Sequence, residues 1–152
     1  MKILVVSDSF KGSMTSKEVG MTICDYYQNH HLEATYLPIS DGGEGFLDAI
    51  NDSFQLEKQQ MQVEDANFNY TESAYIIDQK NKIAYLELAQ SIGLAKLDKN
   101  KLNALYASSF GFGHLIKEII LKYQIKKIII GIGGSATSDL GCGMLEALGV
   151  EF

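Results

Sequence analysis

Short apolar runs alternate with helical patterns along the first fifty residues. Residues 3–6 form an apolar run of strand length, and residues 34–37 predict a second short strand. The capping-box pair Thr15–Glu18 begins a helical pattern that continues to about Asn29, and a second helical pattern occupies residues 46–50. Strand, loop and helix thus occur twice in succession. This order predicts parallel strands whose carboxyl ends lie at one edge of a sheet.

The pattern changes after residue 56. Residues 56–63 and 70–77 alternate apolar and polar side chains, and the polar residues 78–81 predict a turn before the apolar run 83–88. This predicts an antiparallel meander with one face packed on a core and the other exposed to solvent. We therefore place a domain change near residue 57.

A β-branched run near the end, Ile128–Ile130, predicts a strand that is buried on both faces. A glycine-rich loop begins at Gly131, and apolar residues at helical spacing occupy 144–148. Upstream, residues 108–113 predict a turn rich in glycine and hydroxyl groups, followed by a helix that continues to Leu121.

The fold predicted from these patterns belongs to the α/β class. Residues 1–56 form the first part of a parallel Rossmann-like layer, and residues 57–152 form a second, smaller α/β part that contains the antiparallel meander. The chain has 152 residues, of which 46% are hydrophobic and 21% are charged. These values are typical of a globular protein with a core of ordinary size.

Charge and cysteine content narrow the function. The net charge is −6 and the sequence contains no arginine, the residue best suited to contact phosphate backbones, so we predict no nucleic-acid partner. Cys24 and Cys142 lie in predicted helices without metal-ligand spacing, which is typical of reduced, packed thiols. Residues 1–6 are followed closely by Asp8, and no apolar run reaches transmembrane length. We therefore predict no signal peptide, no membrane association and a cytoplasmic location.

Two polar loops follow the first two predicted strands, at the sheet edge where α/β proteins bind ligands. In residues 7–13, Lys11 stands beside Gly12 and between hydroxyl residues. Its ammonium group is either a solvated surface charge or a group that binds phosphate. In the second loop, Asp41 and Glu44 flank a glycine pair. They form either a simple turn or a carboxylate pair that binds Mg²⁺ or activates a hydroxyl group.

The glycine-rich loop allows three interpretations. Residues 131–136 match the G-x-G-x-x-G/A pattern of dinucleotide sites, and Glu151 follows where a ribose-binding acid would lie. The same glycines could instead form a tight structural turn, or present backbone amides to a phosphate or carboxylate group. Asp139 is either a charge at a helix start or a ligand of a metal or substrate. Glu87 ends an apolar strand, where a buried carboxylate requires a partner or a role.

Together these motifs resemble the type I glycerate kinase family, in the family's order and along the whole chain. Members of that family phosphorylate glycerate with ATP and Mg²⁺ in the cleft between two α/β domains, and they are more than twice as long. The resemblance therefore implies the amino-terminal portion of such an enzyme, with residues 57–152 incomplete at the carboxyl-terminal end and the rest of the enzyme as a candidate partner. The matching segments are Asp8–Ser13, Asp41–Gly45, Glu87–Ala89, Gly93–Leu94, Ser108–Gly113, Gly131–Thr137, Gly141, Gly143 and Ala147–Gly149.

The resemblance also implies roles for individual residues. Lys11, Asp8 and Asp41 are expected to be catalytic, and Glu44 and Asp139 are expected near Mg²⁺. Glycerate and the phosphate groups are expected at Ser9, Gly12, Ser13, Gly42, Gly43, Gly133, Gly134, Ser135 and Thr137.

The sequence departs from the family pattern at two places. Leu140 stands where a small residue, commonly glycine, is usual, and Ser108 and Ser109 stand where threonine is more usual. Two other hypotheses stay open: an inactive or split-gene fragment that needs a complementary chain, and a dinucleotide-binding domain.

Overall fold

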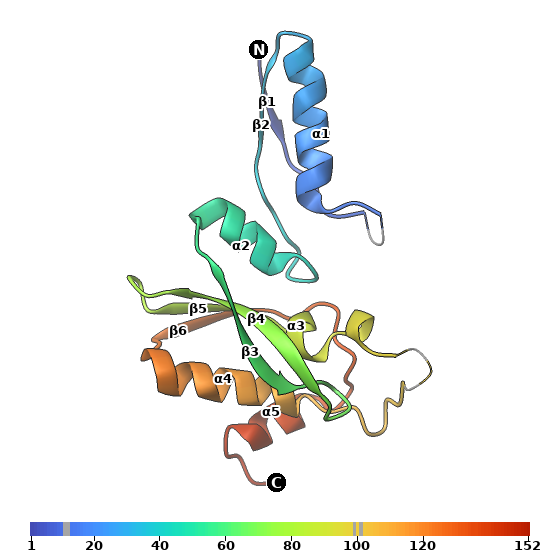
Figure 1. The fold of residues 1–152 in the computed structure, drawn as a ribbon, viewed down its shortest axis with the longest axis vertical. Helices are drawn as coiled ribbons and strands as arrows, with labels where there is room; N and C mark the ends of the chain where they lie inside the picture. Colours follow the sequence, from blue (N-terminus) through green and yellow to red (C-terminus); the bar gives the residue numbers. More distant parts are fainter. Residues whose placement is uncertain (11–12, 99, 101) are drawn as a thin grey trace.

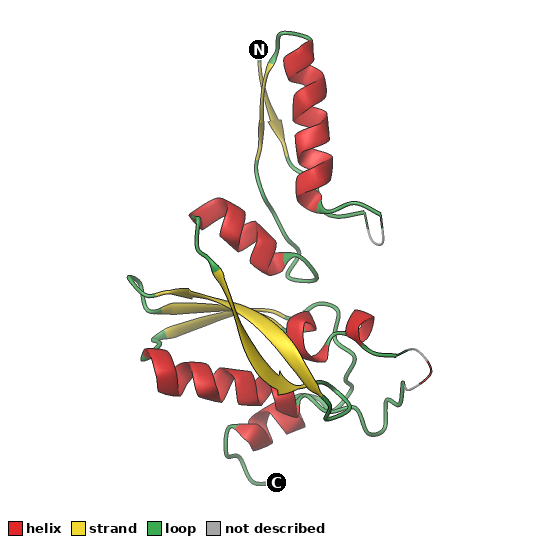
Figure 2. Ribbon diagram, viewed as in Figure 1, coloured by secondary structure: helices red, strands yellow, loops and turns green. Residues whose placement is uncertain are grey.

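The fold is known from a computed structural model, which describes residues 1–10, 13–98, 100 and 102–152. Its architecture is mixed α/β (Figures 1 and 2). The elements are β1 (Lys2–Val5), α1 (Ser16–Asn29), β2 (Glu33–Tyr36), α2 (Phe46–Phe54), β3 (Lys58–Glu64), β4 (Tyr70–Asp78), β5 (Ile83–Glu87), α3 (Ala89–Ile92), the short 3₁₀ helix η1 (Leu94–Lys96), α4 (Phe110–Tyr123), β6 (Lys127–Gly131) and α5 (Cys142–Ala147).

The first unit contains β1, α1 and β2. The two strands are parallel, as predicted, with Val5 paired to Tyr36. The helix begins where the sequence predicted, because the Thr15 side chain accepts a hydrogen bond from the Glu18 amide while the Glu18 carboxylate accepts one from the Thr15 amide. Val5, Cys24 and Ala34 form the small core between the helix and the strands.

The second unit is a four-stranded sheet in the order β3-β4-β5-β6. The first three strands form the predicted antiparallel meander, and β6 then pairs parallel to β5. One face of this sheet carries the main core, in which Tyr75, Ile77 and Leu86 pack with Phe112 and Leu115 of α4. Figure 1 shows α4 on one side of the sheet and α2 on the other. The mixed α/β class predicted from the sequence is confirmed.

The prediction that one face of the meander is exposed to solvent is wrong for the centre of the sheet. Alternate residues of β4 and β5 point away from α4, and two of them, Ile76 and Tyr85, form a second core cluster with Leu47 of α2. Leu47 and Ile76 have no exposed surface. Helix α2 therefore connects the first unit to the sheet. It covers the face that the alternating pattern predicted to be exposed to solvent.

The prediction for Ile128–Ile130 is also wrong in part. These residues do form a strand, but β6 lies at the edge of the sheet and Ile130 is 36% exposed. A β-branched run is typical of strands with two covered faces, but its composition does not specify the position of a strand within the sheet.

The predicted turn at residues 108–113 is largely helical. Helix α4 begins at Phe110, so Gly111 and Gly113 lie in its first two turns. Both are buried. Because glycine has no side chain, the helix can approach the backbone of neighbouring segments closely at these two positions. A Cβ atom on Gly111 would lie 1.8 Å from the Glu64 carbonyl oxygen, and one on Gly113 would lie 2.3 Å from the Met144 carbonyl oxygen.

Gly111→Ala is expected to lower the free energy of unfolding by about 2 kcal/mol. Alanine favours the helix by about 1 kcal/mol over glycine, but the overlap with the Glu64 carbonyl forces α4 away from β3 at a larger cost. Urea denaturation measures the change, with Lys117→Ala at an exposed position of the same helix as the control. A stabilised Gly111→Ala variant would contradict this close approach.

Candidate functional site

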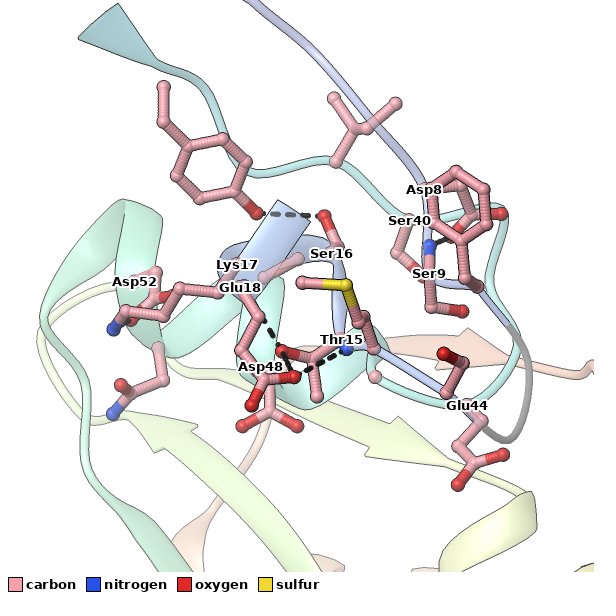
Figure 3. A pocket seen from close by; sticks show the side chains of 18 of the residues that line it. Asp8, Ser9, Thr15, Ser16, Lys17, Glu18, Ser40, Glu44, Asp48 and Asp52 are labelled. Carbon is pink, nitrogen blue, oxygen red and sulfur yellow. Dashed lines mark hydrogen bonds and ion pairs between the residues drawn. The ribbon is translucent and has the colours of Figure 1, made fainter. Parts of the chain in front are cut away.

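The main cavity has a volume of about 520 Å³ and lies between the first unit and α2. Its walls are the loop after β1, the first turn of α1, the loop after β2 and one side of α2 (Figure 3). The carboxyl ends of the two parallel strands therefore open into it, as the sequence pattern predicted. The polar residues that line it include Asp8, Ser9, Ser13, Thr15, Ser16, Lys17, Glu18, Ser40, Glu44, Asp48, Asn51, Asp52 and Gln90.

Four of the residues predicted for the site, Asp8, Ser9, Ser13 and Glu44, line this cavity together. Lys11 and Gly12 lie outside the described residues. Asp41, Gly42 and Gly43 belong to the adjoining loop, and Gly133 of the glycine-rich loop contacts that loop without lining the cavity. Sequence reasoning did not select Gln90 or the α2 residues Asp48 and Asp52, because none of them stands in a recognisable motif.

Acidic side chains outnumber basic ones in the described lining of the cavity. Asp48 forms an ion pair with Lys58 at 2.6 Å, and Asp52 forms one with Lys17 at 2.7 Å. The hydrogen bond to Asp52 raises the pKa of Lys17 above its usual value. The neighbouring carboxylates Asp8, Glu18 and Glu44 also line the space. A phosphate-bearing ligand would therefore need a bound cation to offset this negative charge.

The described residues fit one mode of magnesium binding. Among residues 1–10, 13–98, 100 and 102–152, no group of three or more His, Cys, Asp or Glu side chains is arranged to hold a metal ion. Magnesium ions that act on nucleotides usually take only one or two carboxylates, with water and phosphate oxygens completing the shell. Glu44 lines the cavity with an exposed carboxylate and is suited to that smaller contribution.

The loop at residues 40–45 combines turn geometry with exposed carboxylates. The Asp41 carboxylate accepts a hydrogen bond from the Gly43 amide at 2.8 Å, and the Ser40 hydroxyl accepts one from the Gly42 amide at 3.1 Å. Asp41 and Glu44 are both exposed. Asp41 thus forms the turn that the Asp-Gly pair predicts, and its carboxylate also stays accessible to a ligand.

This loop packs directly on the glycine-rich loop that follows β6. The Gly133 amide donates a hydrogen bond to the Gly42 carbonyl at 2.9 Å. A Cβ atom on Gly131 would lie 2.7 Å from that same carbonyl oxygen, and one on Gly133 would lie 2.6 Å from the Gly43 Cα atom. Gly131 and Gly133 are therefore required for this contact, and the Gly133 amide is already used in it.

The other residues of the glycine-rich loop are attached to α3 and its surroundings. The Leu94 amide donates to the Gly134 carbonyl and the Ala136 amide donates to the Ile92 carbonyl, each at 2.9 Å. The hydroxyl groups of Ser135 and Thr137 lie 3.0 Å apart. These contacts support the structural interpretation of the glycine pattern over much of its length.

The helix that follows does not have the arrangement of a dinucleotide site. In that arrangement a helix begins directly at the glycine turn and directs its amides at a pyrophosphate. Here α5 begins only at Cys142, and its first amides are bound within the protein: Gly143 donates to the Asp139 carboxylate and Met144 to the Ser109 hydroxyl. The structure therefore disfavours the dinucleotide hypothesis.

Asp139 is surrounded by donors from the protein. Its carboxylate accepts hydrogen bonds from the Ser109 amide at 2.7 Å, the Ser109 hydroxyl at 2.8 Å, the Gly143 amide at 3.1 Å and the Gly141 amide at 3.2 Å. Burial raises the pKa of Asp139, but these hydrogen bonds outweigh it and hold the pKa below its usual value. Asp139 thus joins the start of α4 to the start of α5, and its assignment to Mg²⁺ stays a prediction.

The sequence expectation for the cysteines needs correction. Cys24 is buried, but Cys142 is exposed, so only one of the two free thiols is packed. His114 also has a partner, since its Nδ1 atom lies 2.7 Å from the Glu64 carboxylate. The two residues come from α4 and β3, and local spacing gives no signal for such a pair.

Leu140 has a left-handed backbone, with a φ of 55°, and its side chain is 96% exposed. Leu140→Gly is expected to raise the free energy of unfolding by about 0.5 kcal/mol, because relief of left-handed strain slightly exceeds the extra chain entropy of glycine. Leu105→Gly is the control, since Leu105 is 90% exposed and has no positive φ. Equal urea midpoints for the two variants would show that the left-handed backbone at Leu140 does not destabilise the protein.

Comparisons with known proteins identify the family to which this chain is similar. The sequence pattern described as the Glycerate kinase family matches residues 3–152. The chain is 39% identical over 151 residues to a glycerate kinase of Halalkalibacterium halodurans, covering 98% of this chain and 40% of that protein. It is 35% identical over 153 residues to a glycerate 2-kinase of Escherichia coli, covering 99% of this chain and 40% of that protein.

A solved structure gives the same result. A crystal structure ascribed to glycerate kinase 2 of Salmonella typhimurium superposes with a TM-score of 0.81 at 32% identity, covering 98% of this chain and 41% of that one. The chain thus spans about 40% of the length of the relatives that it matches. Because the family pattern extends over residues 3–152, the chain belongs to the glycerate kinase family.

Proposed function

We propose that this chain provides the amino-terminal part of a glycerate kinase, which transfers the γ-phosphoryl group of ATP to a hydroxyl group of glycerate. The family match over residues 3–152 carries this proposal. The cavity at the ends of β1 and β2 supports it, since loops rich in hydroxyl and carboxylate groups meet there. Phosphoryl transfer depends mainly on positioning and on stabilisation of charge, and such loops can supply both.

The proposed roles follow the chemistry of the side chains. Lys11 would stabilise negative charge on the transferred phosphoryl group, and Asp41 or Asp8 would orient the hydroxyl group and accept its proton. Glu44 would bind Mg²⁺, which would offset the negative charge of the phosphate groups. The amides that follow Gly133 would contact a phosphate or carboxylate group.

A cytoplasmic location is part of the proposal and rests on the free thiols of Cys24 and Cys142. In the part of the chain that the structure describes, no helix has the length and apolar character to cross a membrane.

The deciding experiment measures ADP release with ATP, Mg²⁺ and glycerate. It is run on this chain alone and on the chain mixed with a polypeptide corresponding to the remaining length of its relatives. Reactions without glycerate give the background, and Asp41→Asn is the matched variant because it changes charge with little change in shape. Glycerate-dependent release in either arm supports the proposal, and no release in either arm contradicts it in favour of an inactive fragment. An NAD(H) titration tests the dinucleotide hypothesis separately.

A further inference from the structure

Glu87 is a buried carboxylate for which the proposed chemistry has no role. It is the last residue of β5 and has no exposed surface. Together with Ile83 and Tyr85 it lies on the face of the sheet that α2 covers. Burial of a carboxylate is costly unless hydrogen bonds compensate for the lost water, so its contacts indicate why it is there.

The first contact of Glu87 is with the amino-terminal end of α2. Its Oε2 atom accepts a hydrogen bond from the Leu47 amide at 3.0 Å. The N-cap residue of this helix is Gly45, which has no side chain to accept such a bond. Glu87 therefore supplies from the sheet the acceptor that an N-cap side chain normally supplies, and its negative charge is favourable at that end of the helix.

The second contact connects Glu87 to the cavity wall. Its Oε1 atom accepts a hydrogen bond from Nε2 of Gln90 at 3.0 Å, and Gln90 lines the cavity. The nearby Lys96 ammonium group donates to the carbonyl oxygens of Gln90 and Glu72. Both oxygens of the carboxylate thus accept hydrogen bonds, one from the backbone of α2 and one from Gln90, which a ligand in the cavity would contact.

These contacts place an anchor on each side of the acidic part of the loop. Before Glu44, the loop is held by the bond from the Gly133 amide to the Gly42 carbonyl. After Glu44, it is held by the bond from Leu47 to Glu87. The side chains of Phe46 and Leu47 also pack against the sheet. The two hydrogen bonds fix the backbone on either side of the exposed Glu44 carboxylate, so its position relative to the cavity depends on both anchors.

We propose that Glu87 is a positioning residue, which fixes the loop at residues 41–47 and the side chain of Gln90 for the ligands of the cavity. The expected effect of Glu87 on turnover rests on the proposed function, whereas its expected effect on the loop does not. Loss of the carboxylate releases the start of α2 and changes the orientation of Glu44, while the sheet itself stays folded.

The test compares Glu87→Ala and Glu87→Gln with Leu86→Ala. Leu86 is also fully buried on β5 but faces the α4 side, so it controls for a general loss of stability. Amide hydrogen exchange is measured at residues 42–47, with the Leu115 amide as a reference for global opening. In Glu87→Ala the Leu47 amide is expected to exchange at least 10-fold faster, relative to Leu115, than in Leu86→Ala. Glu87→Gln keeps one acceptor and is expected to fall between them.

The kinetic measurement is a separate arm. In an active preparation, Glu87→Ala is expected to lower kcat at least 10-fold, with partial rescue in Glu87→Gln and a much smaller effect in Leu86→Ala. Equal relative exchange at Leu47 in Glu87→Ala and Leu86→Ala overturns the positioning role, whatever the turnover. If the unaltered protein lacks turnover, the proposed function fails, and exchange still decides whether Glu87 holds the loop. If Glu87→Ala does not fold, Glu87→Gln decides it by the same comparison.

Discussion

Lys11→Ala is expected to lower kcat by about 10²- to 10³-fold while the fold stays intact, the effect typical of losing one charge that stabilises a transition state. The reason lies in the sequence: Lys11 is a cation in a polar loop after β1, and the described lining of the cavity is rich in carboxylates. The measurement is steady-state turnover of glycerate in whichever preparation is active, the chain alone or the reconstituted enzyme.

The control for this prediction is Lys2→Ala. Lys2 belongs to the same unit, but it is an exposed residue whose ammonium lies 3.4 Å from the Glu33 carboxylate, so its loss should leave kcat unchanged. Lys11→Arg keeps the charge and should retain part of the activity. Near-normal turnover in Lys11→Ala would remove Lys11 from the mechanism without affecting the rest of the site.

Asp139→Ala is expected to lower the free energy of unfolding by about 3 kcal/mol at neutral pH. The change removes the acceptor for four hydrogen bonds and leaves the amides of Ser109, Gly141 and Gly143 without it. Because these amides begin or precede α4 and α5, both helix starts should lose order together. Urea denaturation measures the change, and Asp25→Ala at an exposed position of α1 is the control.

The effect of Asp139 should depend on pH. Its pKa is lowered in the folded protein, so its contribution is complete above the pKa of an unfolded aspartate, about 3.9, and is lost as the pH falls through the lowered folded value. The difference in stability between the unaltered protein and Asp139→Ala should therefore be constant near neutrality and shrink below about pH 5. A difference that stays constant into acid would show that the carboxylate charge has no part in the effect.

Local patterns were sufficient for most elements of this fold. The capping box at Thr15, the period-two alternation of β4 and the apolar runs of β1 and β2 each predicted the observed element within a residue or two at its ends. These signals depend on neighbouring residues alone, so the surrounding structure need not be known. The order of strand, loop and helix also placed the carboxyl ends of β1 and β2 at one cavity.

The failures concern contacts between distant parts of the chain. Gly111 looked like a turn residue because glycine is common in turns, but its absent side chain makes room for the Glu64 carbonyl. The hydrogen bonds of Asp139 could not be predicted either, because its partners include Ser109, which stands at the start of a different helix. Only the folded arrangement brings these groups together, and the periodicity of neighbouring residues does not predict such contacts.

The contact between the two glycine loops also has a consequence for folding during synthesis. The loop that carries Asp41 and Glu44 emerges from the ribosome before its anchors Glu87 and Gly133, which lie more than 40 and about 90 residues further along the chain. Contacts over such long sequence separations form slowly because loop closure costs entropy before the contact repays it. The nascent chain can therefore complete the helix α1 well before its acidic loop reaches a fixed position. The loop of the candidate site should therefore reach its final position later than α1.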